Sequence, residues 1–397
     1  GARAEDFVVD GIKYSTDSPS EGEVTITGYE NIAGDIVIPS TVTYEGVEYE
    51  VTCIGGFNYS PVSSVTIPST VRSINKYAFI GSSLNSIYFE SPSSLTEIDS
   101  MAFNSCRELK SIELPNSVKS IGLGAFTDCT GLTSVKIPEA VTSIGEYVFA
   151  SCTGLISVEI SAAITSIGRN LFSDCTGLTS IKIPKTVTSI GLYAFQNCTG
   201  LTSVEFETPS SLTEIEEYAF INCDSLKSIT LPASIMHIDY STAFFNCNNL
   251  QAIHIDEQSP AYSSINGVVY DKDGTTLYIV PFGLKELTIP ASVTDIRTNF
   301  LNGDLLHINV DEQNSSYSSF EGMLFDKEQT TLLLVPRGST PTGTKDINLP
   351  STVTTIGKRA LFGNNNKIAI KIPSSVTLIE DSAFVFCPLS NFVIRSI

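Results

Sequence analysis

The sequence has few of the side chains on which catalysis and metal binding usually depend. It contains three histidines, His237, His254 and His307, and no tryptophan. It also lacks the HExxH and CxxC patterns of zinc sites and the GxSxG turn of serine hydrolases. We therefore predict no catalytic residues, no metal site and no cofactor, and we expect the protein not to be an enzyme.

Positive charge is also scarce. The 397 residues include 23 Lys and Arg against 43 Asp and Glu, which gives a formal net charge of −20. Such a charge repels the phosphates of nucleic acids and the surfaces of anionic membranes. No run approaches the roughly 20 apolar residues that span a bilayer. The sequence therefore predicts no nucleic-acid partner and no transmembrane segment.

What the chain has in abundance is repetition. Residues 138–149 and 184–195 follow one template in the same register, and the full unit reads LxxVxIPxxVxxIGxxAFxxC. The commonest spacing of its second isoleucine is 23 residues. That isoleucine recurs at Ile54, Ile74, Ile98, Ile121, Ile144, Ile167, Ile190, Ile215, Ile238, Ile296, Ile356 and Ile379. This periodicity predicts a solenoid of about 12 coils.

Each unit carries two short extended pieces and a tight turn. Residues 132–137 alternate apolar and polar side chains as a short strand does, and Pro138 ends that strand because it has no N–H. Residues 141–145 predict a second extended piece, and residues 148–152 predict a short 3₁₀ or helical turn. One coil cannot bury its own apolar residues, so stacked coils are expected to share one continuous core.

The template resembles the BspA-like (Treponema-type) leucine-rich repeat of bacterial surface proteins. Strand, proline, Ile-Gly, Ala-Phe and Cys occur together in units such as 109–129 and 178–198. The resemblance implies an α/β-type leucine-rich-repeat solenoid, a right-handed superhelix rich in β-structure. It also implies a secreted or cell-surface protein whose signal peptide has been removed. Such a protein mediates adhesion by binding a protein or glycan on a host or neighbouring cell.

We divide this one continuous domain into four regions. They are an N-terminal hairpin cap over 1–52, leucine-rich repeats over 53–255, repeats interrupted by two duplicated β-hairpin insertions over 256–349, and C-terminal repeats over 350–397. The duplication is visible in the sequence, because residues 256–264 match residues 311–319. We interpret each copy as a hairpin that projects from the solenoid.

Eight of the nine cysteines occupy one position of the repeat, with Cys247 one residue late. They are Cys106, Cys129, Cys152, Cys175, Cys198, Cys223, Cys247 and Cys387. Ser82, Asp304 and Asn364 take this position in other units, and nine cysteines cannot all pair. Adjacent coils are close enough for disulfides, but the pattern favours buried thiols that fill the core.

The candidate binding residues lie mainly in one predicted surface column. It holds Tyr88, Glu113, Lys136, Glu159, Lys182, Glu205, Thr230 and His254, each just before the last apolar position of the first strand. Charges alternate in the middle of the column, which favours correct stacking, and solenoids also use this face to bind partners. Tyr262 and Tyr317 in the duplicated segments are further candidates, because tyrosine contributes strongly to interfaces.

Two other functions stay open at this point. A polysaccharide-active enzyme on a β-solenoid needs only a few charged residues in a groove, and a structural spacer needs no site at all. An enzyme site is expected to break the repeat with clustered charges on adjacent coils, whereas the departures here are matched hairpins. No pattern in the sequence specifies the oligomeric state.

Overall fold

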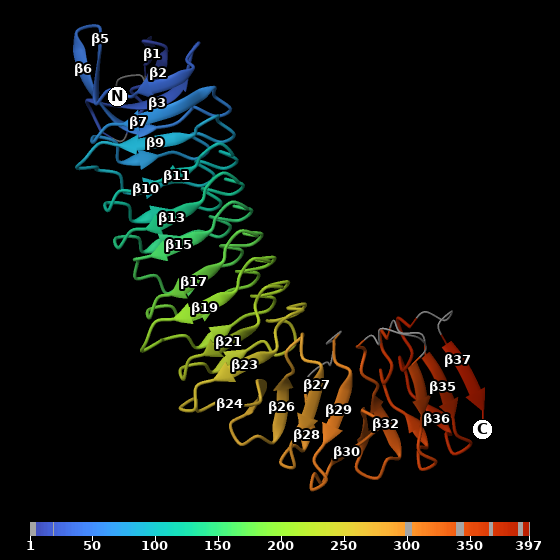
Figure 1. Cartoon of the computed structure of the whole chain (residues 1–397). Helices are drawn as coiled ribbons and strands as arrows, with labels where there is room; N and C mark the ends of the chain where they lie inside the picture. The colour runs from blue at the N-terminus through green and yellow to red at the C-terminus, as the bar shows by residue number, and fades with distance from the viewer. Residues whose placement is uncertain are drawn as a thin grey trace. The chain divides into compact units, whose positions relative to one another are not determined.

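Short parallel strands from successive coils align into two columns around a shared core. The computed structural model describes residues 5–18, 20–297, 304–338, 345–364, 368–387 and 392–396. The chain divides into two compact units. Unit 1 comprises Gly1–Asp224 with His237–Ala243, and unit 2 comprises Ser225–Met236 with Phe244–Ile397. In Figure 1 the successive coils of each unit lie side by side.

The first column of unit 1 contains the strand that opens each repeat. It consists of β4 (Gly34–Val37), β7 (Val62–Ile67), β9 (Ser86–Phe89), β11 (Ser111–Ile112), β13 (Ser134–Ile137), β15 (Ser157–Ile160), β17 (Ser180–Ile183) and β19 (Ser203–Phe206). Strands within this column pair in parallel, as β13 does with β15. Side chains alternate, so that Val135 and Ile137 are buried while Ser134 and Lys136 are exposed.

The second column of unit 1 contains the isoleucine of each repeat. It consists of β3 (Glu23–Tyr29), β6 (Val47–Ile54), β8 (Ser73–Ile74), β10 (Glu97–Ile98), β12 (Ser120–Ile121), β14 (Ser143–Ile144), β16 (Ser166–Ile167), β18 (Ser189–Ile190), β20 (Glu214–Ile215) and β22 (His237–Ile238). At its N-terminal end, β1 (Asp6–Val9) and β2 (Ile12–Ser15) extend β3 as an antiparallel meander. β5 (Thr41–Tyr44) pairs antiparallel with β6.

Unit 2 repeats the same two columns. Its first column consists of β21 (Ser228–Leu231), β23 (Ala252–Ile255), β27 (Glu286–Ile289), β29 (His307–Val310), β33 (Lys345–Asn348), β35 (Ile368–Ile372) and β37 (Phe392–Ser396). Its second column includes β28 (Asp295–Ile296), β34 (Thr355–Ile356) and β36 (Leu378–Ile379).

The duplicated segments form three strands each and remain part of the stack. They are β24 (Tyr262–Ile265), β25 (Val268–Asp271) and β26 (Thr276–Ile279), then β30 (Tyr317–Phe320), β31 (Met323–Asp326) and β32 (Thr331–Leu334). β24 and β25 form an antiparallel hairpin, but β26 also pairs in parallel with β28. β32 pairs with β34 in the same way. The third strand of each segment therefore continues the second column instead of projecting from it.

The solenoid has about 15 turns, more than the 12 expected. Leu277 and Leu332 take the isoleucine position in β26 and β32, opposite Ile296 and Ile356. Ile26 takes it in β3, which precedes the first clear repeat. Counting isoleucines in the template misses these three turns, because leucine fills the same buried position and the first turn lacks the rest of the motif.

The expected 3₁₀ or helical turns are absent from the described residues, which contain no helix. Each coil closes instead through successive β-turns, in which Ala150 N–H donates to Tyr147 C=O and Cys152 N–H donates to Phe149 C=O. Tyr147 and Ser151 have φ values of 60° and 58°. Left-handed residues at this spacing cannot continue a right-handed helix, so the turn stays irregular.

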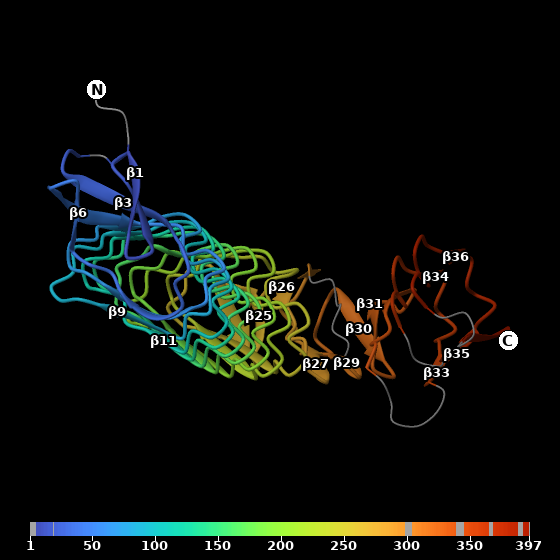
Figure 2. The same cartoon turned by 90° about the horizontal axis from the view of Figure 1, so that it is seen from above.

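A column of phenylalanine rings fills the core of unit 1. It consists of Phe57, Phe79, Phe103, Phe126, Phe149, Phe172, Phe195 and Phe220, all fully buried. Neighbouring rings are stacked, with centroids 5.1–5.8 Å apart. Viewed as in Figure 2, the coils of unit 1 lie one behind another around this shared interior. The continuous core predicted from the repeat is therefore confirmed.

Six cysteines, Cys106, Cys129, Cys152, Cys175, Cys198 and Cys223, are buried in unit 1 as free thiols. Cys129 Sγ and Cys152 Sγ donate to the carbonyl oxygens of Phe103 and Phe126 in the preceding coil, each over 3.2 Å. Burial raises the pKa of Cys152 to about 12 and, despite a bond with Ser82, that of Cys106 to about 11. These thiols satisfy a backbone acceptor while filling the core, as the sequence favoured.

The phenylalanine column yields a stability prediction. Phe172 is fully buried, and its ring lies 5.8 Å from Phe149 and 5.6 Å from Phe195. Phe172→Ala is expected to lower the free energy of unfolding by about 3–5 kcal/mol, because it leaves a cavity between two rings. Tyr59→Ala, at a side chain 72% exposed, is the control and is expected to change little. Equal denaturant midpoints for the two variants would contradict an internal phenylalanine column.

The thiol ladder yields a reactivity prediction. Iodoacetamide at about pH 8 is expected to modify the half-buried Cys53 well before Cys106 or Cys152, because the thiolate is the reactive form and burial raises the pKa of the last two. Peptide mass spectrometry of the folded protein measures the rates, and the protein in denaturant serves as control. Rapid labelling of Cys152 in the folded protein would show that the ladder does not face inward.

Candidate binding groove

Three adjoining hollows follow the first column of unit 1, and we call them together the strand groove. The middle hollow has a volume of about 690 Å³ and runs over β11, β13 and β15. A second, of about 440 Å³, shares Glu113, Leu114 and Asn116 with it, and a third, of about 540 Å³, shares Val158 and Glu159. The groove therefore extends across consecutive coils instead of forming one closed pocket.

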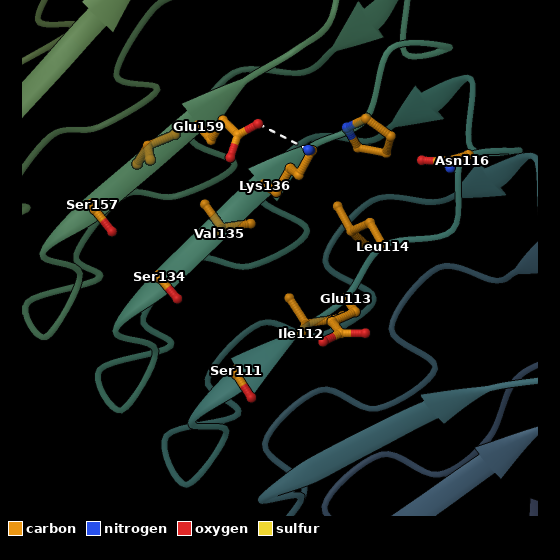
Figure 3. A pocket seen from close by; sticks show the side chains of 12 residues that line it. Ser111, Ile112, Glu113, Leu114, Asn116, Ser134, Val135, Lys136, Ser157 and Glu159 are labelled. Carbon is orange, nitrogen blue, oxygen red and sulfur yellow. Dashed lines mark ion pairs between the residues drawn. The ribbon is translucent and has the colours of Figure 1, made fainter.

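The outward side chains of the strands give the groove a polar surface. Ser111, Ser134 and Ser157 are register neighbours on β11, β13 and β15, and all three line the middle hollow. Figure 3 shows these hydroxyls as one row, with Lys136 and Glu159 further along the strands. Because strand side chains alternate, each hydroxyl and the charged residue two positions later point out on the same face. The groove thus presents a hydroxyl row beside a row of charges.

An ion pair joins two coils in the middle hollow. Lys136 and Glu159 are register partners on β13 and β15, and Lys136 Nζ lies 2.9 Å from Glu159 Oε1. The hydrogen bond between them, with their mutual attraction, raises the pKa of Lys136 and lowers that of Glu159. Since the pKa of Glu159 is lowered on folding, the pair stabilises the folded state at pH values above the ordinary pKa of a glutamate side chain. That contribution is lost as the pH falls through the lowered pKa.

Lys136 forms its ion pair with the register partner Glu159, as the alternation of charges predicts. The next lysine of the column forms its ion pair with a different residue. Lys182 and Glu205 are register partners on β17 and β19. Lys182 Nζ nevertheless lies 3.6 Å from an oxygen of Glu207, the residue directly after β19. Glu113 belongs to none of the ion pairs formed by the described residues. Its carboxylate is therefore the most available charge of the middle hollow.

The structure brings together four of the predicted site residues. Glu113, Lys136 and Glu159 line the middle hollow, and Lys182 lines the third hollow with Glu159. Tyr88 lies on β9 with 60% of its surface exposed, outside the three hollows.

The other candidates are not in the groove. Glu205 on β19, Thr230 on β21 and His254 on β23 are exposed. Tyr262 is half-buried and packs edge-to-face on Tyr278, with ring centroids 5.8 Å apart. Tyr317 is half-buried too, and its hydroxyl donates to the Thr294 carbonyl over 3.4 Å. Tyr262 therefore packs within its own segment, whereas Tyr317 also contacts the residue that precedes β28.

Sequence reasoning missed the coil that forms the third hollow. Ser161, Ala162 and Ala163 line it, where other units have proline and larger side chains. The Ser161 N–H, which proline would lack, donates to Ile137 C=O over 3.0 Å. On the far side of this coil the first-column ladder breaks, because β15 and β17 belong to different sheets. The missing proline of the template was the signal that could have identified this coil.

The described part of the chain contains neither a cluster of metal-binding side chains nor a membrane-spanning helix. No group of three or more His, Cys, Asp or Glu side chains in it is placed to hold a metal ion. Nor does it contain a helix long and apolar enough to cross a membrane.

The ion pair of the groove can be tested by charge reversal. Lys136→Glu is expected to lower the melting temperature, because it sets a carboxylate beside Glu159 in register. Lys136→Glu combined with Glu159→Lys restores opposite charges and is expected to recover most of the loss at low salt. High salt should shrink the difference between the variants. A double variant no more stable than the single one would show that the two side chains do not interact.

Comparisons with known proteins agree with this architecture. The model of the BspA type leucine-rich repeat region matches residues 55–179, 165–306 and 340–397. A leucine-rich repeat protein from Bacteroides ovatus is 26% identical, with a TM-score of 0.62, over 99% of this chain and 100% of that one. A leucine-rich cell surface protein from Faecalibacterium prausnitzii is 24% identical, with a TM-score of 0.52, over 100% of this chain and 95% of that one.

No curated protein matches the chain. The family model nevertheless covers well over half of its residues, and the repeat that carries the match is the one that builds both strand columns. The chain therefore belongs to the family of BspA-type leucine-rich-repeat proteins.

Proposed function

We propose that this protein acts outside the cell or at the cell surface, where the strand groove binds a protein or a glycan of a host or neighbouring cell. The observation that carries the proposal is the continuity of the groove over consecutive coils. A polar channel of this length suits an extended or broad ligand better than a small molecule. Solenoids typically bind extended ligands along such faces. The family membership and the surface location of one structural neighbour support the compartment.

The side chains of the groove favour binding through hydrogen bonds. The serine row offers a donor and acceptors on each coil, and Glu113 adds an available acceptor. Sugar hydroxyls and exposed peptide groups are both satisfied by such a surface. Because the charges alternate along the groove, a strongly acidic or a strongly basic ligand would meet like charges in part of it. A neutral or mixed-charge ligand is therefore the best fit.

We also propose that the groove is not catalytic. Cleavage of a glycosidic bond needs a carboxyl group whose pKa is raised, so that it can act as a general acid. Glu159 has the opposite property, because Lys136 lowers its pKa. The carboxylate that lies centrally in the groove is thus suited to recognition and poorly suited to donating a proton.

Binding by the groove can be tested with a matched pair of variants. Ser134→Arg places a bulky side chain in the middle hollow, whereas Ser203→Arg changes the same repeat position on β19 outside the three hollows. Wild-type protein is screened on arrays of matrix proteins and glycans. Ser134→Arg is expected to weaken each interaction found by about tenfold or more, and Ser203→Arg is expected to leave it unchanged.

Two results would contradict the proposal. One is the absence of any ligand for the wild-type protein on both arrays. The other is equal behaviour of the two arginine variants, which would place the contact elsewhere. Release of reducing ends from an array polysaccharide, abolished by Glu113→Gln, would instead support the enzyme.

A further inference from the structure

The first column of unit 1 ends in an open strand edge. β4 pairs in parallel with β7, and β7 pairs with β9, so β4 is the outermost strand of this sheet. No other described strand pairs with its second edge. The meander β1–β3 extends the neighbouring second column and does not pair with this edge.

The backbone of β4 shows which groups face outward. Gly34 N–H donates to Pro61 C=O over 3.2 Å, and Ile38 N–H donates to Thr66 C=O over 3.0 Å. Since backbone groups alternate in direction along a strand, residues 34, 36 and 38 face β7. The N–H and C=O groups of Asp35 and Val37 therefore point to the open edge. These groups could pair with a further strand, and no described strand occupies that position.

Proteins usually protect such an edge, and β4 is only partly protected. It is short, and its register shifts between Gly34 and Asp35, which blunts the start of the strand. The remainder carries no lysine, and Val37 is 70% exposed. On the same face, Val37 is the register neighbour of Thr66, which is the neighbour of the exposed Tyr88. An exposed apolar side chain, that of Val37, thus lies beside the open backbone groups.

The N-terminal region that carries this edge is strongly acidic. Residues 5–54 contain eleven acidic residues and one basic residue, Lys13. Lys13 already contacts Glu30, with Nζ 3.4 Å from Oε1. Asp35 lies on β4 itself, and its Oδ1 accepts hydrogen bonds from the hydroxyls of Ser63 and Ser64 over 3.1 and 2.7 Å. The field of this region attracts cations and repels acidic segments.

We propose that β4 is a docking site for an extended basic polypeptide segment of a partner, which adds to the sheet as a further strand. The outward groups of Asp35 and Val37 supply the main-chain hydrogen bonds, as in other cases of strand addition. Val37 receives an apolar side chain of the segment, and the acidic N-terminal region selects lysine and arginine at other positions. This site shares no residue with the strand groove and does not depend on the function proposed for it.

Fluorescence anisotropy tests the site with a labelled heptapeptide of alternating lysine and valine. Wild-type protein is expected to bind this peptide, more weakly at high salt because charge attraction is screened. Two other peptides serve as comparisons. One alternates glutamate and valine, and the other is the lysine peptide with alternate amides N-methylated, so that one edge cannot donate. Both are expected to bind at least about tenfold more weakly.

A matched pair of variants locates the contact. Val37→Pro removes the outward N–H but keeps the bonds to β7, and proline is tolerated on strand edges. Val37→Thr keeps the N–H and nearly the same shape. Val37→Pro is expected to weaken binding about tenfold relative to Val37→Thr. The groove variant Ser134→Arg is expected to bind the peptide like wild type, which separates the two sites.

Three outcomes would overturn this inference. The first is no binding of the lysine peptide to the wild-type protein. The second is equal binding of the N-methylated peptide, which would mean that charge alone attracts it. The third is equal binding by Val37→Pro and Val37→Thr, with both shown to be folded by their melting curves. If Val37→Pro fails to fold, the N-methylated peptide still decides the question with wild-type protein.

Discussion

The whole architecture depends on identical side chains stacking on one another from coil to coil. The phenylalanine rings of unit 1 lie 5.1–5.8 Å apart and nearly parallel, and each is buried only because its neighbours cover both faces. Isoleucines and cysteine thiols follow the same rule in their own columns. A single coil has no core of its own, so stability resides in the contacts between coils. Most inward positions therefore keep side chains of similar size along the stack.

Outward positions obey a weaker constraint, and their side chains differ more from coil to coil. Neighbouring outward side chains are also stacked, so like charges at adjacent coils are unfavourable, while hydroxyls and opposite charges are acceptable. The serine row and the Lys136–Glu159 pair satisfy this constraint. The same stacking that fixes the core thus produces straight rows of polar groups on the surface. A long polar groove is a direct consequence of the repeat.

The sequence predicted what repetition determines, and it failed where a position is filled by a different residue or shaped by several coils. The Ile, Phe and Cys columns followed from spacing. The turn of Leu277 was missed because leucine replaces isoleucine there, and the irregular turns were missed because left-handed residues such as Tyr147 have no simple pattern. Four of the predicted surface residues line the groove. Its depth and extent depend on how coils pack, which no single unit specifies.

Proline explains where the repeat departs from regularity. In regular units it follows the last apolar residue of the first strand and has no N–H to donate. Where it is absent, Glu90, Ser161, Glu207, Asp256 and Asp311 each donate that N–H to the preceding coil over 2.9–3.1 Å. The strand ends at the same position, but the residue after it is held to the preceding coil by one more hydrogen bond. Two of these residues begin the duplicated segments, and the other three line the outer hollows of the strand groove. A single backbone donor, present or absent, thus marks the coils that depart from the regular template.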